Sequence, residues 1–205
     1  MSIRPSPSRL LAVLLAAFAA ACSSPPTPKD TFYRLEVAEP ARRFDRAPIP
    51  GVLEINRFDT DGVLSERALA YQEAGKGVQR YRYDFWSEPP GVMLQDKVAA
   101  YLAAAHAAQR IVTPDLRVPP DFALRGKLRR FEQIAGADRV AVEMQLALVS
   151  ARDGSLVVMN TYSSQVPTDG EAPEAATAAM GRAVSDILGR FLADLSDATI
   201  PAPRR

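Results

Sequence analysis

The feature that most constrains the fold is a pair of alternating stretches joined by a turn. From 140 to 150 apolar side chains recur at every second position, and the stretch from 156 to 166 follows shortly after Asp153 and Gly154. Alternation with period two places one set of side chains on one face of a strand, and an Asp-Gly dipeptide favours a tight turn. The sequence therefore predicts an antiparallel hairpin with one buried face.

Shorter alternating stretches predict the remaining strands of a sheet. The glycines at 75 and 77 fit a turn between two of these stretches, which would form a second, smaller hairpin. The stretches lie at residues 31–37, 51–58, 69–72, 78–85 and 122–131.

Two amphipathic helices are predicted from apolar residues that recur three and four positions apart. The first has Ser87 as a candidate N-cap and Pro89-Pro90 in its first turn, and its apolar stripe ends near Ala108. The second begins with Pro173 at a first helical position and runs to about Asp197.

These elements predict the α+β fold class, with a mixed, mostly antiparallel sheet and the two amphipathic helices packed on one face. We expect six or seven strands, most of them linked as hairpins. A single domain of this kind would span residues 31–198, and the Pro-rich residues 199–205 would form a flexible tail.

The first residues predict a targeting signal instead of a folded element. Residues 1–21 carry two arginines and then a run, Leu10–Ala21, without a polar side chain. The run is shorter than the roughly 20 apolar residues that a membrane-spanning helix needs. It ends at Cys22 after small residues, which resembles the lipobox of bacterial lipoproteins. That resemblance implies cleavage before Cys22 and acylation of this cysteine; soluble secretion with a spare thiol is the alternative.

Residues 22–30 are rich in Pro and Ser, which predicts an extended tether between the anchor and the domain. Position 23 is Ser, not Asp, which resembles the sorting signal for export to the outer membrane. We therefore expect a lipid anchor in the outer membrane, with the domain on the periplasmic face.

Composition excludes several functional classes. The 25 basic and 24 acidic side chains nearly cancel, so no basic surface for nucleic acid is indicated. One Cys excludes an internal disulfide, and one His, His106 near the end of the first helix, excludes sites built from several imidazoles. We expect no catalytic residues, no metal and no cofactor, and therefore no enzyme; a lipid-anchored enzyme is the third-ranked alternative.

Two sets of side chains are candidates for binding a partner or lipid. The aromatic residues that lead into the first helix form one set, although core packing explains them more simply. The second set alternates along the strand at 122–131, where a solvated face is the simpler interpretation. The two sets are Tyr81, Tyr83 and Trp86, and Arg125, Lys127 and Arg129.

Three segments together resemble the ABC-type transport auxiliary lipoprotein family. They are Phe32-Tyr33-Arg34-Leu35, the run from Tyr83 to Pro90 (YDFWSEPP), and the closing hairpin with its helix. The resemblance implies an α+β domain on a lipid anchor, without catalytic residues.

The same resemblance implies a role in intermembrane lipid transport. The partners would be an MCE-domain protein and an inner-membrane ABC permease and ATPase, with assembly into a homo-oligomer left open. The alternative is an outer-membrane lipoprotein that activates a cell-wall synthase or assists envelope assembly; the protein that co-purifies would separate the two.

Overall fold

The computed structural model describes residues 28–202. The predicted signal peptide, Cys22 and most of the tether therefore lie outside the described residues. Within the described part, no helix is both long and apolar enough to cross a membrane.

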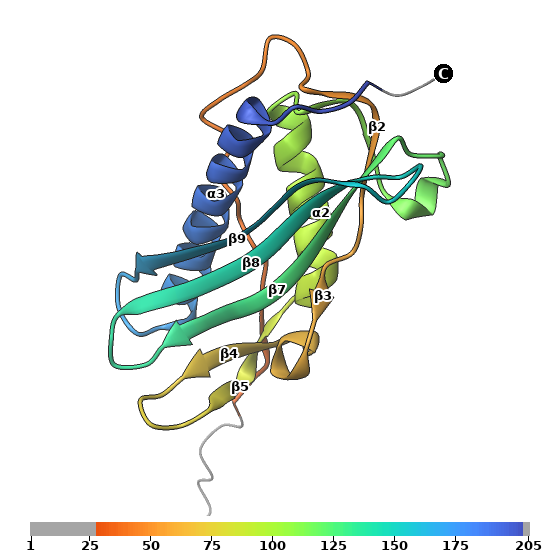
Figure 1. Ribbon diagram of the computed structural model, residues 1–205. Helices are drawn as coiled ribbons and strands as arrows, with labels where there is room; N and C mark the ends of the chain where they lie inside the picture. The colour runs from red at the N-terminus through yellow and green to blue at the C-terminus, as the bar shows by residue number, and fades with distance from the viewer. Residues whose placement is uncertain (1–27, 203–205) are drawn as a thin grey trace, which may run out of the picture.

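The sheet is organised around one long strand, β7 (Phe122–Ile134) (Figure 1). One edge of β7 pairs antiparallel with β8 (Arg139–Ser150), which pairs in turn with β9 (Leu156–Pro167). This pairing confirms the hairpin predicted from the alternating stretches. The opposite edge of β7 pairs in succession with three shorter, parallel strands: β2 (Ile49–Ile55), β3 (Asp59–Thr60) and β4 (Ala68–Gln72).

Three further strands complete the sheet. β5 (Val78–Trp86) pairs antiparallel with β4 and forms the predicted second hairpin. β1 (Thr31–Tyr33) lies parallel to β5, and β6 (Ala108–Val112) lies parallel to β2. The sheet is mixed, as predicted, and its two long ladders, β7–β8 and β8–β9, are antiparallel. It has nine strands in the described residues, more than expected, because β3 and β6 had no clear alternation.

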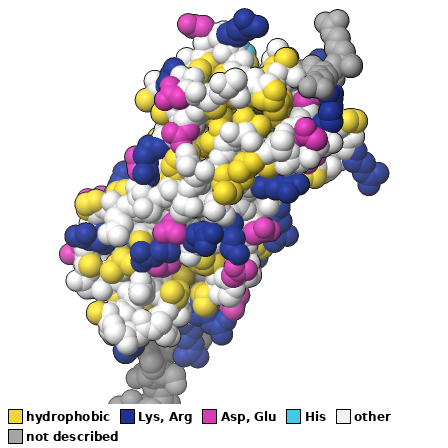
Figure 2. Space-filling model, in the orientation of Figure 1, with side chains coloured by type: hydrophobic (Ala, Val, Ile, Leu, Met, Phe, Trp, Pro, Cys, Tyr) yellow, Lys and Arg dark blue, Asp and Glu magenta, His cyan; other side chains and the backbone are white. Residues whose placement is uncertain are grey.

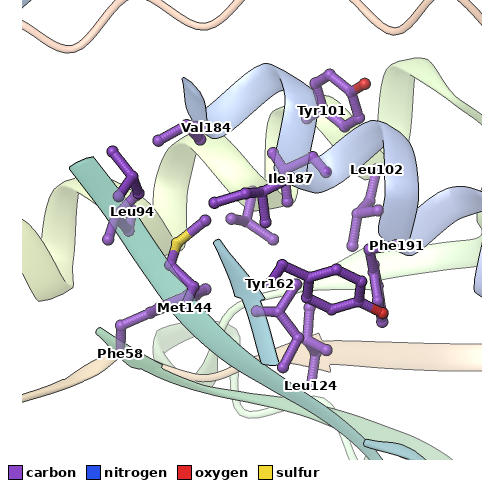
Figure 3. Close-up of a cluster of buried hydrophobic side chains, with 14 of the residues drawn as sticks. Phe58, Leu94, Tyr101, Leu102, Leu124, Met144, Tyr162, Val184, Ile187 and Phe191 are labelled. Carbon is purple, nitrogen blue, oxygen red and sulfur yellow. The ribbon is translucent and has the colours of Figure 1, made fainter. Parts of the chain in front are cut away.

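Two α-helices of the described chain, α2 (Pro90–Ala104) and α3 (Pro173–Asp197), pack on one face of this sheet (Figure 1). Figure 3 shows Leu94 and Leu102 of α2, and Ile187 and Phe191 of α3, directed toward sheet residues such as Met144. Each of these side chains is fully buried. Burial of one such side chain is worth about 1.5–3 kcal/mol, so this layer supplies the main stabilisation of the fold.

The predicted first strand, 31–37, is wrong beyond Tyr33. From Arg34 the chain leaves the sheet and crosses the helices as a strap, residues 34–46. The backbone N–H of Ala38 donates to Ser185 Oγ at 2.9 Å, and the N–H of Phe44 donates to the carbonyl of Ala105 at 2.9 Å. The alternation in the sequence reflects burial of Leu35 by the helices, not pairing in the sheet.

The boundaries of α2 also differ from the prediction. Ser87 is not the N-cap: Pro89 occupies that position without a side-chain hydrogen bond, and the Ser87 N–H donates to the carbonyl of Tyr33. The helix ends at Ala104, because His106 adopts a left-handed conformation (φ 55°) and turns the chain into β6. The second helix, by contrast, has the predicted bounds.

The seating of the strap on α3 depends on one glycine. A Cβ at Gly181 would lie 1.9 Å from the carbonyl oxygen of Glu36, so only a residue without a side chain fits there. Gly189, further along α3, is exposed, and its Cβ would lie 3.7 Å from Tyr101 Oη, an ordinary contact.

We expect Gly181→Ala to lower the free energy of unfolding by about 2 kcal/mol, because the strap must shift. Gly189→Ala is the matched control and should raise it by about 0.8 kcal/mol, since Ala favours a helix interior over Gly. Urea unfolding followed by Trp86 fluorescence measures both. Equal stabilisation by the two changes would show that the strap does not rest on α3.

Candidate functional site

The predicted aromatic residues fall into different environments. Trp86 is 1% exposed and stacks on Phe131 with ring centroids 5.1 Å apart, so it is a core side chain that presents no surface to a partner. Tyr81 is half-buried, and its hydroxyl donates to Gln133 Oε1 at 2.6 Å. Burial is the main cause that raises the pKa of Tyr81. Tyr83 is half-buried beside Arg82, whose guanidinium lies 5.3 Å from the ring centroid.

The strand that carries Tyr81, Tyr83 and Phe85 is irregular. The β4–β5 register shifts between Ala68 and Ala70, so that β5 carries extra residues at this point. Phe85 stacks on Phe32 of β1, with ring centroids 5.7 Å apart.

The structure brings together a surface at β1 and β5 of which sequence reasoning singled out Tyr81 but not Phe32 or the arginines. Phe32 is 52% exposed, and the Arg67 guanidinium lies 5.2 Å from its ring centroid. Next to it, a hollow of about 310 Å³ is lined in part by Arg80, Arg82 and Phe85. We call these five residues, Phe32, Arg67, Arg80, Arg82 and Phe85, the β1–β5 patch.

The predicted basic residues lie on the side of β7 that faces away from the helices, as the alternation indicated. Arg125 is exposed, Lys127 Nζ pairs with Asp61 Oδ2 at 2.7 Å, and an Arg129 guanidinium N–H donates to Gln145 Oε1 at 3.4 Å. Surface ion pairs of this kind contribute at most about 1 kcal/mol. The cations of this row therefore contribute little to fold stability.

Exposed apolar side chains share this side of the sheet. In register, Arg125 lies opposite Ala147, which lies opposite Met159, and Leu156 lies opposite Val149. Met159 is 50% exposed and Leu156 is 55% exposed. Figure 2, from the same viewpoint as Figure 1, shows basic, acidic and apolar side chains interspersed over this side of the molecule. We call this surface, with Arg125, Lys127, Arg129, Leu156 and Met159, the outer face.

Tyrosine hydroxyls cross-link the elements around the core. Tyr33 Oη lies 3.0 Å from Asp84 Oδ1 and 3.1 Å from Glu174 Oε1, which joins β1, β5 and α3. The Tyr162 hydroxyl donates to Asp194 and joins β9 to α3. Burial, followed by these carboxylates, raises the pKa of Tyr33 and of Tyr162 well above the ordinary value.

A hollow of about 630 Å³ lies where the start of the strap meets α2. Its charged side chains are of both signs, and its single hydroxyl, Ser87, has no imidazole among the lining residues. His106 lies elsewhere, with Nδ1 2.9 Å from the carbonyl of Phe44. Among residues 28–202, no three His, Cys, Asp or Glu side chains gather in a way that could hold a metal ion.

A family model described as the ABC-type transport auxiliary lipoprotein component matches residues 33–190. The chain belongs to this family. The match confirms the resemblance carried by residues 32–35 and 83–90, and it assigns this auxiliary component to the lipoproteins associated with ABC-type transport.

Solved structures support the fold of this auxiliary component. The crystal structure of protein XCC0632 from Xanthomonas campestris is similar with a TM-score of 0.70 and 17% identity, covering 79% of this chain and 92% of that one. An uncharacterized protein is similar with a TM-score of 0.63 and 12% identity, covering 80% of this chain and 99% of that one. No curated protein matches the sequence.

The Tyr162 cross-link predicts how stability of the auxiliary component depends on pH. The folded state holds the Tyr162 proton above pH 10, where the unfolded state releases it, so the free energy of unfolding falls as the pH rises past 10. Tyr162→Phe should make this decline less steep and should cost about 1.5 kcal/mol at pH 7, through loss of a hydrogen bond to a carboxylate.

Urea unfolding of Tyr162→Phe between pH 7 and pH 11 tests this expectation. Tyr83→Phe is the control, because the Tyr83 hydroxyl makes no hydrogen bond to the described residues; it should keep the wild-type pH dependence. An unchanged alkaline decline in Tyr162→Phe would rule out this cross-link as its source.

Proposed function

We propose that this protein is a non-catalytic docking component of an intermembrane lipid transport system. It works with an MCE-domain protein and with an inner-membrane ABC permease and ATPase. The observation that carries the proposal is the family match over residues 33–190, which spans nearly all of the described domain.

In this proposal Cys22 carries the lipid anchor, in the outer membrane and facing the periplasm. Two or more acyl chains hold a protein stably on a bilayer, since each buried CH₂ contributes about 0.8 kcal/mol. The tether, residues 22–30, spans at most about 3 Å per residue when extended. It enters the domain at β1, which is fixed by its pairing with β5 and by the Tyr33 hydroxyl.

The outer face is the proposed docking surface for the MCE-domain partner. Exposed Leu156 and Met159 supply apolar area, and the cations of β7 would recognise an acidic surface on the partner. Complementary charge speeds association and selects the partner, and tethering raises the local concentration. Weak contacts then suffice to keep the partners together.

Three tyrosines with raised pKa values have structural roles in the domain. Tyr33, Tyr81 and Tyr162 owe their raised pKa values first to burial, and their hydroxyls join one element of secondary structure to another. Each of these hydroxyls therefore has a structural role that accounts for it.

Cys22→Ala should abolish lipid transport while the domain remains folded, because the anchor and not the fold is removed. Transport is measured in cells that carry only this variant, with its melting temperature as the control for folding. Retained transport would contradict the anchoring role. Co-purification of a cell-wall synthase with the wild-type protein, in place of an MCE-domain protein, would favour the envelope-assembly alternative.

Arg125→Glu combined with Arg129→Glu should weaken capture of the MCE-domain protein by at least about tenfold, because two attractive charges become repulsive. The matched control is Arg43→Glu combined with Arg46→Glu, two exposed arginines of the strap with the same change in net charge. Binding assays at low and high salt measure both. Equal weakening by the two pairs would show that net charge, and not the outer face, governs binding.

A further inference from the structure

We propose that the β1–β5 patch is a membrane-contact surface that binds anionic phospholipid headgroups. The proposal rests on the lipid anchor at Cys22 that is part of the proposed function. It adds a second, non-covalent contact between the domain and the bilayer, which fixes how the domain is oriented there.

Phe32 is the apolar element of this surface. Half of its area is exposed, and its ring stacks on Phe85 and lies 5.2 Å from the Arg67 guanidinium. An aromatic ring flanked by a cation suits the interface of a bilayer, where apolar and charged groups meet. The packing keeps this ring available at the surface instead of burying it.

The arginines are the charged element. Arg80 and Arg82 line the hollow of about 310 Å³ together with Ala68, Tyr81 and Phe85. Arg80 pairs with Glu66, whereas Arg67 and Arg82 form no ion pair with any carboxylate of residues 28–202. A guanidinium offers two parallel N–H groups to a phosphate, so the hollow suits a phospholipid headgroup with its glycerol against the apolar wall.

The position of the patch favours a membrane over a protein partner. Phe32 is the second residue of β1, and eight residues, 23–30, separate this strand from the anchor at Cys22. At about 3 Å per residue the tether reaches roughly 27 Å when extended, so the patch stays within reach of the bilayer. Figure 1 shows that the described chain begins beside β5, and Figure 2 shows basic side chains gathered at that end of the molecule.

The test uses the only cysteine of the chain. The mature chain from Cys22 onward is coupled through this thiol to maleimide lipid in vesicles, which supplies the anchor chemically. Phe32→Trp then reports contact by fluorescence quenching from brominated phospholipid. Met159→Trp is the matched control, because Met159 is exposed to the same extent but lies on the outer face. The native Trp86 is buried in both variants, so its fluorescence serves as a common reference for the two added tryptophans.

On vesicles of brominated phosphatidylcholine with phosphatidylglycerol, the Phe32→Trp signal should lose most of its intensity, and the Met159→Trp signal should not. Arg67→Glu with Arg82→Glu in the Phe32→Trp background should remove the quenching, with the urea midpoint checking that the fold is intact. These results together support the proposal.

Equal quenching at positions 32 and 159 would overturn the assignment, because the patch would have no preferred contact with the bilayer. Equal quenching at position 32 with and without phosphatidylglycerol would overturn the specificity for anionic headgroups. Absence of quenching at position 32 would overturn membrane contact and favour a protein partner for the patch. None of these outcomes depends on whether the cell acylates Cys22 or on transport, so they are distinct from failure of the proposed function.

Discussion

The fold depends on the pairing of β7 along both of its edges. One edge carries β8 along nearly its whole length, while the other is divided among β2, β3 and β4, so a single strand aligns most of the sheet. Close packing at Gly126 makes this arrangement possible, because a Cβ there would lie 2.3 Å from the ring of Phe58. Phe58 in turn donates its N–H to Gly91 in the first turn of α2, which links the sheet to the helix layer.

The N-terminal strand is tied to this framework more firmly than its length indicates. Three residues of β1 pair with β5, the Tyr33 hydroxyl reaches carboxylates of β5 and α3, and the strap then crosses both helices. A force applied at the start of β1 would therefore be transmitted to α3 and the core, not to a single edge strand. This arrangement suits the anchored docking component that we propose.

The local sequence pattern was sufficient to predict an element where its neighbours in sequence are also its neighbours in space. The β8–β9 hairpin and α3 were predicted with nearly their true bounds, because turn chemistry and a long apolar stripe specify them locally. The strap and β6 could not be predicted in this way. Leu35 is buried by helices distant in sequence, and β6 exists because His106 ends α2 early and β2 provides an edge.

The same limit applies to the candidate surfaces. Alternation correctly placed Arg125, Lys127 and Arg129 on the solvent side of β7, since a regular ladder preserves the period of two. Alternation could not predict which aromatic residues are buried and which are exposed, because the β4–β5 register shift breaks the period of two. Trp86 therefore lies in the core, while the ring of Phe32 is exposed. Exposure of an aromatic side chain is set by the neighbouring strand, and only the pairing of β1 with β5 reveals it.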